Sequence, residues 1–495
     1  MKEKMKKFFY TVMSCFVIAG LLYSCNESES NLGQIFDPTQ PIVITTFFPD
    51  SGGIATGMIL EGTNFGSDTT GLRVLFVDQY GTRHRAGLVS STGNQIYAFV
   101  PRMTGLRRMD VVVEREYGGR LFYRDAGHPF YYITQTAVTT VAGVPYAGTV
   151  LATAGGTLGT AVFSSPNSLV VDDEDNIIVV ERGWGAQGLG GHGVVGGGSN
   201  ISVIDQRLGE VRVLVQNGAT SNAPAFSAIA GFETVNVPHD GGGSFYQLPR
   251  VLGYSPRRMS LSEHPRVALY RQNWIYSFVA NTENNLIYSM VWNGHLIRFD
   301  PRIREVEIIA NNILPGVPGE TAMLNAQGET GTNAYLAFCP INPTLLYIAM
   351  EDYNMIARID VSPEALYGLD PAYIKPEWFA GRGHIDGPVH GRGFQDGLLL
   401  EARFFAPKQL AFTSDGRLYI ADTRNHVIRV IDTTVPLDRA TVSTAVGIPG
   451  VPGFRDGGPE VARFNAPTGV AVSADGTAIY VADARNAVIR RLAIQ

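Results

Sequence analysis

Two histidines and a carboxylate, His384, Asp386 and His390, lie close together in the sequence and have side chains that can ligate a metal ion. They fall in a type of loop that, in the next repeat, holds Asp456 and no histidine. A carboxylate that recurs without its histidines is typical of a turn, where it bonds to nearby backbone amides. We therefore expect turn residues here, and neither a metal site nor a cofactor.

Other patterns that could support catalysis are incomplete. The glycine-rich residues 183–198 contain no Gly-Lys-Ser/Thr run and open no helix, which argues against a phosphate-binding loop. The positions directly after the predicted inner strands offer one carboxylate and no histidine. They are Asp172, Ser255, Ala280, Pro340, Thr413 and Ser473. Catalysis is left open, and a non-catalytic function is favoured.

Exposed aromatic rings are the remaining residues with a chemical use, because a flat ring can stack on the C–H face of a sugar. Trp184 is flanked by glycines, which favours exposure, whereas Trp274 and Trp378 lie in strand-like contexts and are expected in the core. The candidates for ligand binding are Trp184, Tyr246, Trp292 and Tyr353.

A sequence repeat must position these residues. Residues 404–429 and 464–490 share an aromatic residue, Ala-Pro, an apolar run, Asp-Gly, a second apolar run and Asn. The Asp-Gly pairs predict hairpin turns, and the apolar runs predict strands. Self-similarity at this length indicates an array of small supersecondary units. Asp422 and Asp483 recur in both units, and we expect them to fix turns between strands.

A four-stranded antiparallel unit repeated around a ring predicts a β-propeller. Further units can be placed near residues 163, 245, 274 and 335, which makes six in total. Five is the alternative, because residues 274–280 could belong to either neighbouring unit. Residues 183–198 and 217–244 are then interpreted as two long, polar, glycine-rich loops.

The two ends of the ring are predicted to pair. Residues 138–143 match residues 442–447, the outer strand that precedes the last unit. The last unit ends after only three predicted strands. Because a ring must close to remove its unpaired sheet edges, we expect residues 138–143 to supply the fourth strand of a propeller over residues 138–495.

The N-terminal residues 1–24 predict an export signal rather than a folded element. Four lysines precede an apolar run, residues 8–22, that is short for a membrane span. Cys25 follows the small residue Ser24 where this run ends, which favours lipidation of Cys25 over an ordinary cleaved signal. Residues 25–40 would then form a flexible, acidic tether.

Composition excludes several classes of protein. The 495 residues contain 56 glycines and 27 prolines with only 17% charged residues, which fits a turn-rich β protein of two or three domains. The net charge is −6 and no basic patch stands out, so nucleic acid is not an expected partner. After cleavage only Cys25 and Cys339 remain, which excludes a disulfide framework.

Residues 41–134 predict a separate small β-sandwich, because short strand-like runs alternate with turn residues. Within it, residues 62–66 (Gly-Thr-Asn-Phe-Gly) combine glycines with Asn64. These residue types favour turns with a positive backbone φ angle, so a structural role is expected for this loop.

Three resemblances to known families add to this interpretation. Residues 467–490 resemble the NHL repeat nearly residue for residue. Residues 41–134 resemble an IPT/TIG domain, an immunoglobulin-like module, with residues 62–66 as the most specific part. The N-terminal segment resembles the surface-export signal of lipoproteins in the Bacteroidetes.

The fold class expected is therefore all-β, an immunoglobulin-like sandwich followed by a six-bladed, or alternatively five-bladed, NHL-type propeller. The layout is similar to lipoproteins that accompany outer-membrane glycan-uptake systems. This resemblance implies a protein anchored by lipid in the outer membrane and exposed on the cell surface. It would bind a polysaccharide or oligosaccharide and hand it to an outer-membrane transporter. The alternatives are a protein-interaction scaffold and a propeller lyase or hydrolase.

Overall fold

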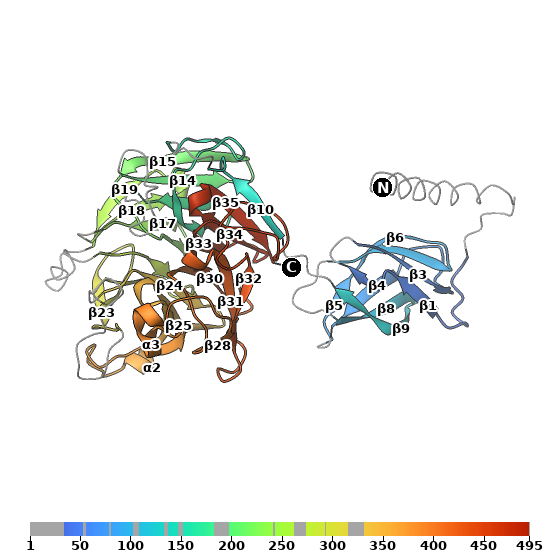
Figure 1. Ribbon diagram of the computed structural model, residues 1–495. Coiled ribbons are helices and arrows are strands. Elements are labelled where there is room, and N and C mark those ends of the chain that lie inside the picture. The colour runs from blue at the N-terminus through green and yellow to red at the C-terminus, as the bar shows by residue number, and fades with distance from the viewer. Residues whose placement is uncertain are drawn as a thin grey trace, which may run out of the picture. The chain divides into compact units, whose positions relative to one another are not determined.

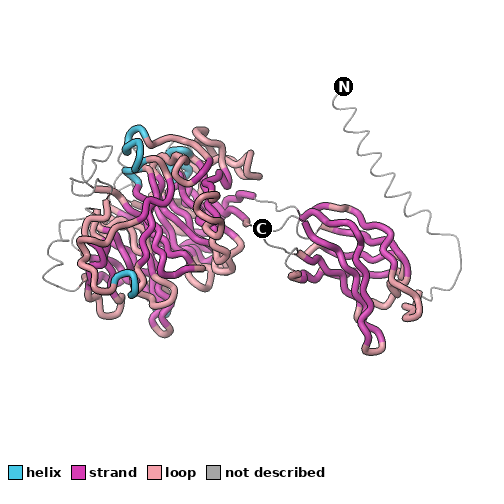
Figure 2. The backbone as a smooth tube through the Cα atoms, turned by 90° about the horizontal axis from the view of Figure 1, so that it is seen from below, coloured by secondary structure: helices cyan, strands magenta, loops and turns pink. Residues whose placement is uncertain are grey.

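The computed structural model describes residues 34–52, 56–78, 81–101, 108–132, 137–146, 152–182, 198–240, 243–261, 274–292, 294–314 and 331–494. The chain divides into two compact units, residues 1–134 and residues 135–495. Strands dominate both units (Figures 1 and 2), and the α-helices of the described part are the short α2 (Pro363–Leu366) and α3 (Gly383–His390). Among these residues, no helix is long and apolar enough to cross a membrane.

Unit 1 is built from two sheets packed face to face. One sheet has the order β1 (Val43–Phe48), β3 (Gly57–Thr63), β7 (Gln95–Phe99) and β6 (Gly87–Ser91). The other has the order β2 (Ser51–Gly52), β9 (Arg120–Tyr132), β8 (Arg108–Tyr117), β4 (Leu72–Val77) and β5 (Arg83–Arg85). The inward side chains alternate with outward ones along each strand, as in a sandwich with one core.

The turn at residues 62–66 has the structural role expected from its residue types. Asn64 has a φ of 62° and Gly66 a φ of 73°. The Asn64 side-chain amide donates to the backbone oxygens of Asp37 and Gln40, at 2.9 and 2.8 Å. These bonds join the segment before β1 to the turn after β3.

Unit 2 contains six sheets in its described part, named sheets I to VI here and given from the inner strand outward. Sheet I is β12 (Pro166–Val171), β13 (Ile177–Glu181), β14 (Ser199–Asp205), β15 (Glu210–Gly218) and β11 (Gly156–Thr157). Sheet II is β16 (Ala225–Ile229), β17 (Phe232–Pro238), β18 (Ser244–Pro249) and β19 (Arg257–Ser260). Sheet III is β20 (Val279–Ala280), β21 (Ile287–Met290), β22 (Leu296–Phe299) and β23 (Val306–Ala310).

The remaining three sheets follow the same plan. Sheet IV is β24 (Ala334–Cys339), β25 (Asn342–Met350), β26 (Met355–Asp360) and β27 (Glu377–Ala380). Sheet V is β29 (Pro407–Phe412), β30 (Arg417–Asp422), β31 (Val427–Asp432), β32 (Thr441–Val446) and β28 (Gly397–Leu398). Sheet VI is β33 (Pro467–Val472), β34 (Ala478–Asp483), β35 (Val488–Ala493) and β10 (Ala137–Ala142).

The inner strands form a closed ring. Each inner strand contacts the inner strand of the next sheet, and β33 of sheet VI contacts β12 of sheet I. The apolar residues between consecutive sheets form the core, so each sheet is covered on both faces by its neighbours. This is the arrangement of a β-propeller.

The predicted pairing of the two ends is confirmed. β10 pairs antiparallel with β35, with Val138 opposite Leu492 and Thr139 opposite Arg491. Figure 1 shows β10 alongside β35, although the two strands lie at opposite ends of unit 2 in the sequence. Sheet VI therefore takes its outer strand from the beginning of the unit and its other three strands from the end.

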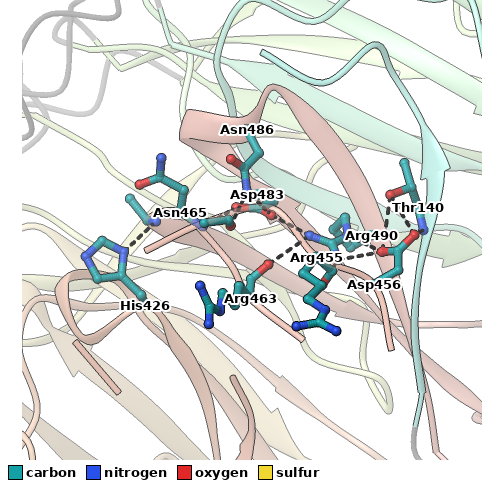
Figure 3. A network of polar contacts seen from close by, with 11 residues as sticks. Thr140, His426, Arg455, Asp456, Arg463, Asn465, Asp483, Asn486 and Arg490 are labelled. Carbon is teal, nitrogen blue, oxygen red and sulfur yellow. Dashed lines mark hydrogen bonds and ion pairs between the residues drawn. The ribbon is translucent and has the colours of Figure 1, made fainter. Parts of the chain in front are cut away.

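A buried arginine holds sheet VI together (Figure 3). The fully buried Arg490 donates to Asp483 at 2.8 Å and to Asp456 at 2.5 Å. Asp456 also accepts from the backbone N and the hydroxyl of Thr140, at 3.1 and 3.2 Å, and so links the arginine to β10. Asp483 also accepts from the Asn465 backbone N at 2.7 Å. The carboxylate therefore fixes the chain between strands, as predicted for Asp483.

Sheet V repeats this network with equivalent residues. Arg429 is fully buried and donates to Asp422 at 2.8 Å and to Asp396 at 2.6 Å, while Asp396 accepts from Thr444. The prediction for Asp422 is confirmed in the same way, because it accepts from the Phe405 backbone N at 2.8 Å. The clearest sequence repeat thus encodes a repeated ion-pair network.

One side chain crosses the ring interior. The Gln409 amide, from sheet V, donates to the Leu169 backbone oxygen at 2.6 Å and accepts from the Leu169 N at 3.1 Å. It passes Gly469 of sheet VI, where a Cβ atom would lie 2.9 Å from the Gln409 Oε1 and 3.0 Å from the Ser168 Cα. Gly469 is therefore needed for this close approach between sheets V and I.

Residues 217–244 differ from their predicted structure. Residues 217–244 were predicted to be a long loop, but they contain β16 and β17 of sheet II. The reason is that polar residues of these strands, such as Thr234 and Asn236, are fully buried between sheets, so the segment lacks an apolar pattern. The Ser362 hydroxyl accepts from the Ala365 N at 3.1 Å and caps α2.

We predict that Arg490→Met lowers the free energy of unfolding by about 3 kcal/mol, because it leaves a buried carboxylate without its cation. Burial already raises the pKa of Asp483 to about 6 with Arg490 beside it. Urea unfolding followed by tryptophan fluorescence measures the change. The control is Arg491→Met on the same strand, and equal effects of the two substitutions would contradict the proposed weight of the buried pair.

Candidate ligand-binding site

Polar side chains from five sheets meet at one face of the ring. In each sheet the start of the inner strand pairs with the end of the second strand, as Pro166 does with Glu181. Residues before inner strands and after second strands therefore lie at the same ring face. Seven of the charged and phenolic residues there, two of them near the start of inner strands, are named the ring-face cluster here: Arg182, Asp240, Tyr276, Tyr335, Glu351, Asp352 and Lys408.

Arg182 and Asp240 form the first half of the cluster. The Arg182 guanidinium lies 3.0 Å from the Asp240 carboxylate and 4.6 Å from the centre of the Tyr276 ring. The Asn222 amide donates to the other Asp240 oxygen at 2.7 Å and to the Ile275 backbone oxygen at 2.6 Å. The arginine and aspartate side chains keep about a fifth of their surface exposed, 19% and 23%. Both can therefore still bond to a ligand.

Lys408 and two carboxylates form the second half. The Lys408 ammonium lies 3.4 Å from the Glu351 carboxylate, which also accepts from the Asn333 amide at 3.0 Å. The Asp352 carboxylate accepts from the Asn333 backbone N at 2.9 Å. Glu351 and Asp352 are adjacent in the short helix η3 (Glu351–Tyr353), so two carboxylates share this small region.

The two halves form one electrostatic unit. Burial raises the pKa of the Tyr335 phenol, the Glu351 charge raises it further, and Arg182 opposes the shift. Burial likewise raises the pKa of Tyr276 to about 12, with Arg182 again opposing. Both phenols are therefore neutral hydrogen-bonding groups between fixed charges at neutral pH.

An aromatic group borders the cluster on sheet III. The Trp274 side chain is 48% exposed and meets Trp292 and Tyr276 edge to face, with ring centres 5.8 and 6.4 Å apart. The Trp274 backbone oxygen accepts from the Trp292 N at 2.9 Å. Gly331 lies against Trp292, because a Cβ at that glycine would fall within 2.4 Å of the indole ring. The neighbouring rings thus hold Trp274 in place beside the charges.

The four aromatic candidates from the sequence have different surroundings. Trp184 lies outside the described residues. Trp292 is half-buried at the edge of the ring-face cluster. Tyr246 is half-buried in β18 and packs edge to face against His239, with ring centres 4.3 Å apart. Tyr353 is fully buried between sheets III and IV, so the expected exposure of this ring is wrong.

Trp274 and the charged residues were missed by sequence reasoning. Trp274 was expected in the core because it lies in a strand-like context, yet nearly half of its surface is exposed. The positions considered for catalysis directly follow the predicted inner strands. These positions lie at the opposite face of the ring. The informative positions follow the second strand of each sheet, as Arg182 follows β13 and Glu351 follows β25.

The turn expected around Asp386 is wrong, because His384, Asp386 and His390 lie in the helix α3 and the Asp386 carboxylate pairs with two arginine side chains. The Asp386 carboxylate bonds to Arg382 at 2.6 Å and to Arg403 at 2.8 Å, and the Arg382 hydrogen bond lowers its pKa to about 2. Within the described ranges, no group of three or more histidine, cysteine, aspartate or glutamate side chains has the arrangement of a metal site.

We predict that Asp352→Asn changes how stability depends on pH. Burial and the neighbouring Glu351 carboxylate together raise the pKa of Asp352 to about 7, whereas the unfolded chain loses this proton near pH 4. Because the folded state holds the proton longer, the contribution of Asp352 to stability is lost as pH rises from about 4 through about 7. The asparagine variant should therefore gain at least about 1 kcal/mol relative to wild type between pH 5 and pH 8.

Urea unfolding of both proteins at the two pH values measures this difference. Glu364→Gln, which changes an exposed carboxylate in α2, is the matched control. A difference between Asp352→Asn and wild type that is the same at both pH values would contradict the assignment.

Comparisons with known proteins bear on the fold. No protein-family model matches the chain. Protein SUPPRESSOR OF QUENCHING 1, chloroplastic, from Arabidopsis thaliana is 33% identical over 98 residues, which is 20% of this chain. The match spans only 9% of that curated relative.

Solved structures are similar over nearly the whole chain. A Bacteroides thetaiotaomicron protein of unknown function has a TM-score of 0.63 at 21% identity, covering 93% of this chain and all of the other. Auxiliary nutrient binding proteins from Bacteroides ovatus and Bacteroides thetaiotaomicron have TM-scores of 0.58 and 0.56, at 20% and 21% identity. They cover 93% and 92% of this chain, and 99% of each of the other chains. At these identities the likeness shows a shared two-unit fold.

Proposed function

We propose that this chain is a cell-surface protein that binds a polysaccharide or oligosaccharide at the ring-face cluster without chemically changing it. The observation that carries the proposal is the exposed Trp274 ring, which contacts Tyr276, while the Arg182 of the Arg182–Asp240 pair lies over the same Tyr276 ring. A flat aromatic face stacks on the C–H face of a sugar, and fixed charged groups bond to its hydroxyls. The combination is typical of binding sites in which a few polar groups orient a ligand on an apolar surface.

The architecture proposed with this function follows the sequence resemblances. Each of sheets I to VI is one blade of a six-bladed NHL-type propeller, supported by the closed ring of inner strands. Unit 1 is an immunoglobulin-like IPT/TIG domain, supported by its two packed sheets. Structures with this two-unit fold include proteins called auxiliary nutrient binding proteins, which supports a role in nutrient capture.

The proposed location is the outer surface of the outer membrane. Cys25 would carry the lipid, and an outer-membrane transporter would receive the glycan. Cys25 lies outside the described residues, so this proposal depends on the sequence alone. We predict that the full chain incorporates radiolabelled palmitate in a Gram-negative host and sediments with membranes. Cys25→Ser should abolish both, and membrane sedimentation of an unlabelled Cys25→Ser protein would contradict the anchor.

We predict that Trp274→Ala weakens binding to the glycan ligand at least tenfold, because stacking of one aromatic ring supplies on the order of 1 kcal/mol beyond its buried area. Affinity electrophoresis of residues 26–495 through gels that contain plant or host polysaccharides measures the affinity. Tyr367→Ala is the matched control, since Tyr367 is 89% exposed and follows α2 on sheet IV. Trp184→Ala tests the remaining sequence candidate in the same gels.

The outcomes separate the rival functions. Retardation that is lost in Trp274→Ala and kept in Tyr367→Ala supports a binder at the ring face. Migration of the wild type unretarded through every gel contradicts glycan binding and favours a protein-interaction scaffold, which pull-down experiments would examine. New reducing ends or unsaturated products in the gel would indicate a lyase or hydrolase instead.

A further inference from the structure

The outer face of one unit 1 sheet carries exposed aromatic rings in register. Phe48 of β1 is aligned with Ile59 of β3, and Ile59 is aligned with Tyr97 of β7. Phe48 is 75% exposed and Tyr97 is 45% exposed. Paired residues in a sheet point to the same side, so these side chains share one face, opposite the core residues Leu60 and Ile96.

Phe99 extends this surface and presents the flat side of its ring. It lies two residues beyond Tyr97, and its paired neighbours across the sheet are Gly57 and Gly87. A Cβ at Gly57 would lie 3.7 Å from the Phe99 Cε1 atom, so the ring extends over the glycine of the next strand. Because that strand has no side chain there, the ring lies along the sheet and is 46% exposed.

The charges on this face indicate what kind of molecule covers it. The next row outward holds Thr46, Glu61 and Gln95, and the Gln95 amide donates to the Glu61 carboxylate at 3.1 Å. Across these rows the described residues include one carboxylate and no cation. Such a surface is not complementary to a polyanion or to phosphate head groups. It suits a neutral ligand that offers both C–H faces and hydroxyl groups.

The spacing favours an extended chain of sugars over a single one. Tyr97 and Phe99 lie about 7 Å apart along one strand, and Phe48 lies two strands away, about 9.5 Å from Tyr97. An extended β-linked polysaccharide turns the same face outward at every second ring, on this length scale. One chain can therefore stack on more than one ring of the face while its hydroxyls meet Glu61 and Gln95.

We propose that Phe48, Tyr97 and Phe99 form a second carbohydrate-binding surface, on unit 1, for a neutral extended polysaccharide. It is separate from the ring-face cluster and requires no ligand contact from unit 2. Under this proposal unit 1 binds ligand and is more than a spacer.

The test uses residues 26–495 and four proteins, wild type, Trp274→Ala, the double variant Tyr97→Ala/Phe99→Ala, and all three substitutions together. Gels carry neutral polymers (xyloglucan, galactomannan or mixed-linkage β-glucan) or the acidic polymer polygalacturonate. We expect the double variant to bind a neutral polymer about tenfold more weakly than wild type. The triple variant should bind more weakly than Trp274→Ala. Tyr123→Ala is the matched control, because Tyr123 is 72% exposed on the other sheet of unit 1.

The readouts distinguish failure of this surface from failure of the ring-face site. The proposal is overturned if the double variant migrates like wild type and the triple variant like Trp274→Ala. It is also overturned if no neutral gel retards the wild type, or if only polygalacturonate does. A loss in the double variant with none in Trp274→Ala supports this surface and contradicts the ring-face site. A change in oligomeric state of the double variant on size-exclusion chromatography, without a change in gels, would assign the face to protein contacts and overturn the proposal.

Discussion

Closure of the ring by β10 is the constraint on which the rest of unit 2 depends. Six sheets can surround a common axis only if the last one meets the first, and here the last sheet is completed by a strand from the start of the unit. Backbone pairing alone would leave this strand at an exposed edge. The Arg490–Asp456–Thr140 contacts add a charge-assisted link from the buried arginine to that edge. The Gln409 side chain of sheet V adds a further link across the interior, because it bonds to the Leu169 backbone of sheet I.

The ring-face cluster follows from this closure. Its residues come from the ends of second strands and from the starts of inner strands in sheets I to V, and only a closed ring brings these to one place. Burial is unfavourable for isolated charges, and the cluster meets this cost by pairing Arg182 with Asp240 and Lys408 with Glu351. The pKa of Asp352 rises because the carboxyl is buried and lies beside Glu351, and these effects outweigh the attraction of Lys408. The site is thus fixed in shape before any ligand arrives.

The sequence predicted sheets V and VI well because each contains a network of polar side chains, Asp, Asn and Arg, at fixed spacing. The strands of sheet II were predicted poorly because the sheet contains no such network of Asp, Asn and Arg at fixed spacing. At the position of Arg429, sheet I has Ser202, and the carboxylate Glu181 is instead satisfied by hydroxyls and backbone amides. Such differences between repeats preserve the strand but remove the residue pattern by which the repeat is identified in the sequence.

Exposure was the property that sequence reasoning predicted least well. Tyr353 and Trp274 both lie next to strands, and their sequences alone give no reason to expect one inside and the other outside. Tyr353 points between sheets III and IV, whereas Trp274 precedes its inner strand at the ring face. The charged residues of the cluster come from different points of the repeats in sheets I, II, IV and V. Their grouping arises from the ring and leaves no local pattern.

The position of β10 has a mechanical consequence. Any tension between unit 1 and unit 2 enters the ring at Ala137, which is paired with Ala493 at the very end of the chain. A force applied at Ala137 and perpendicular to the strands would break the hydrogen bonds between β10 and β35 one pair at a time, starting from Ala137. An antiparallel pair resists this direction of force least. Thr140, held by Asp456, lies only three residues further and acts as the stop. A force transmitted through unit 1 would therefore act on this one strand before the rest of the ring.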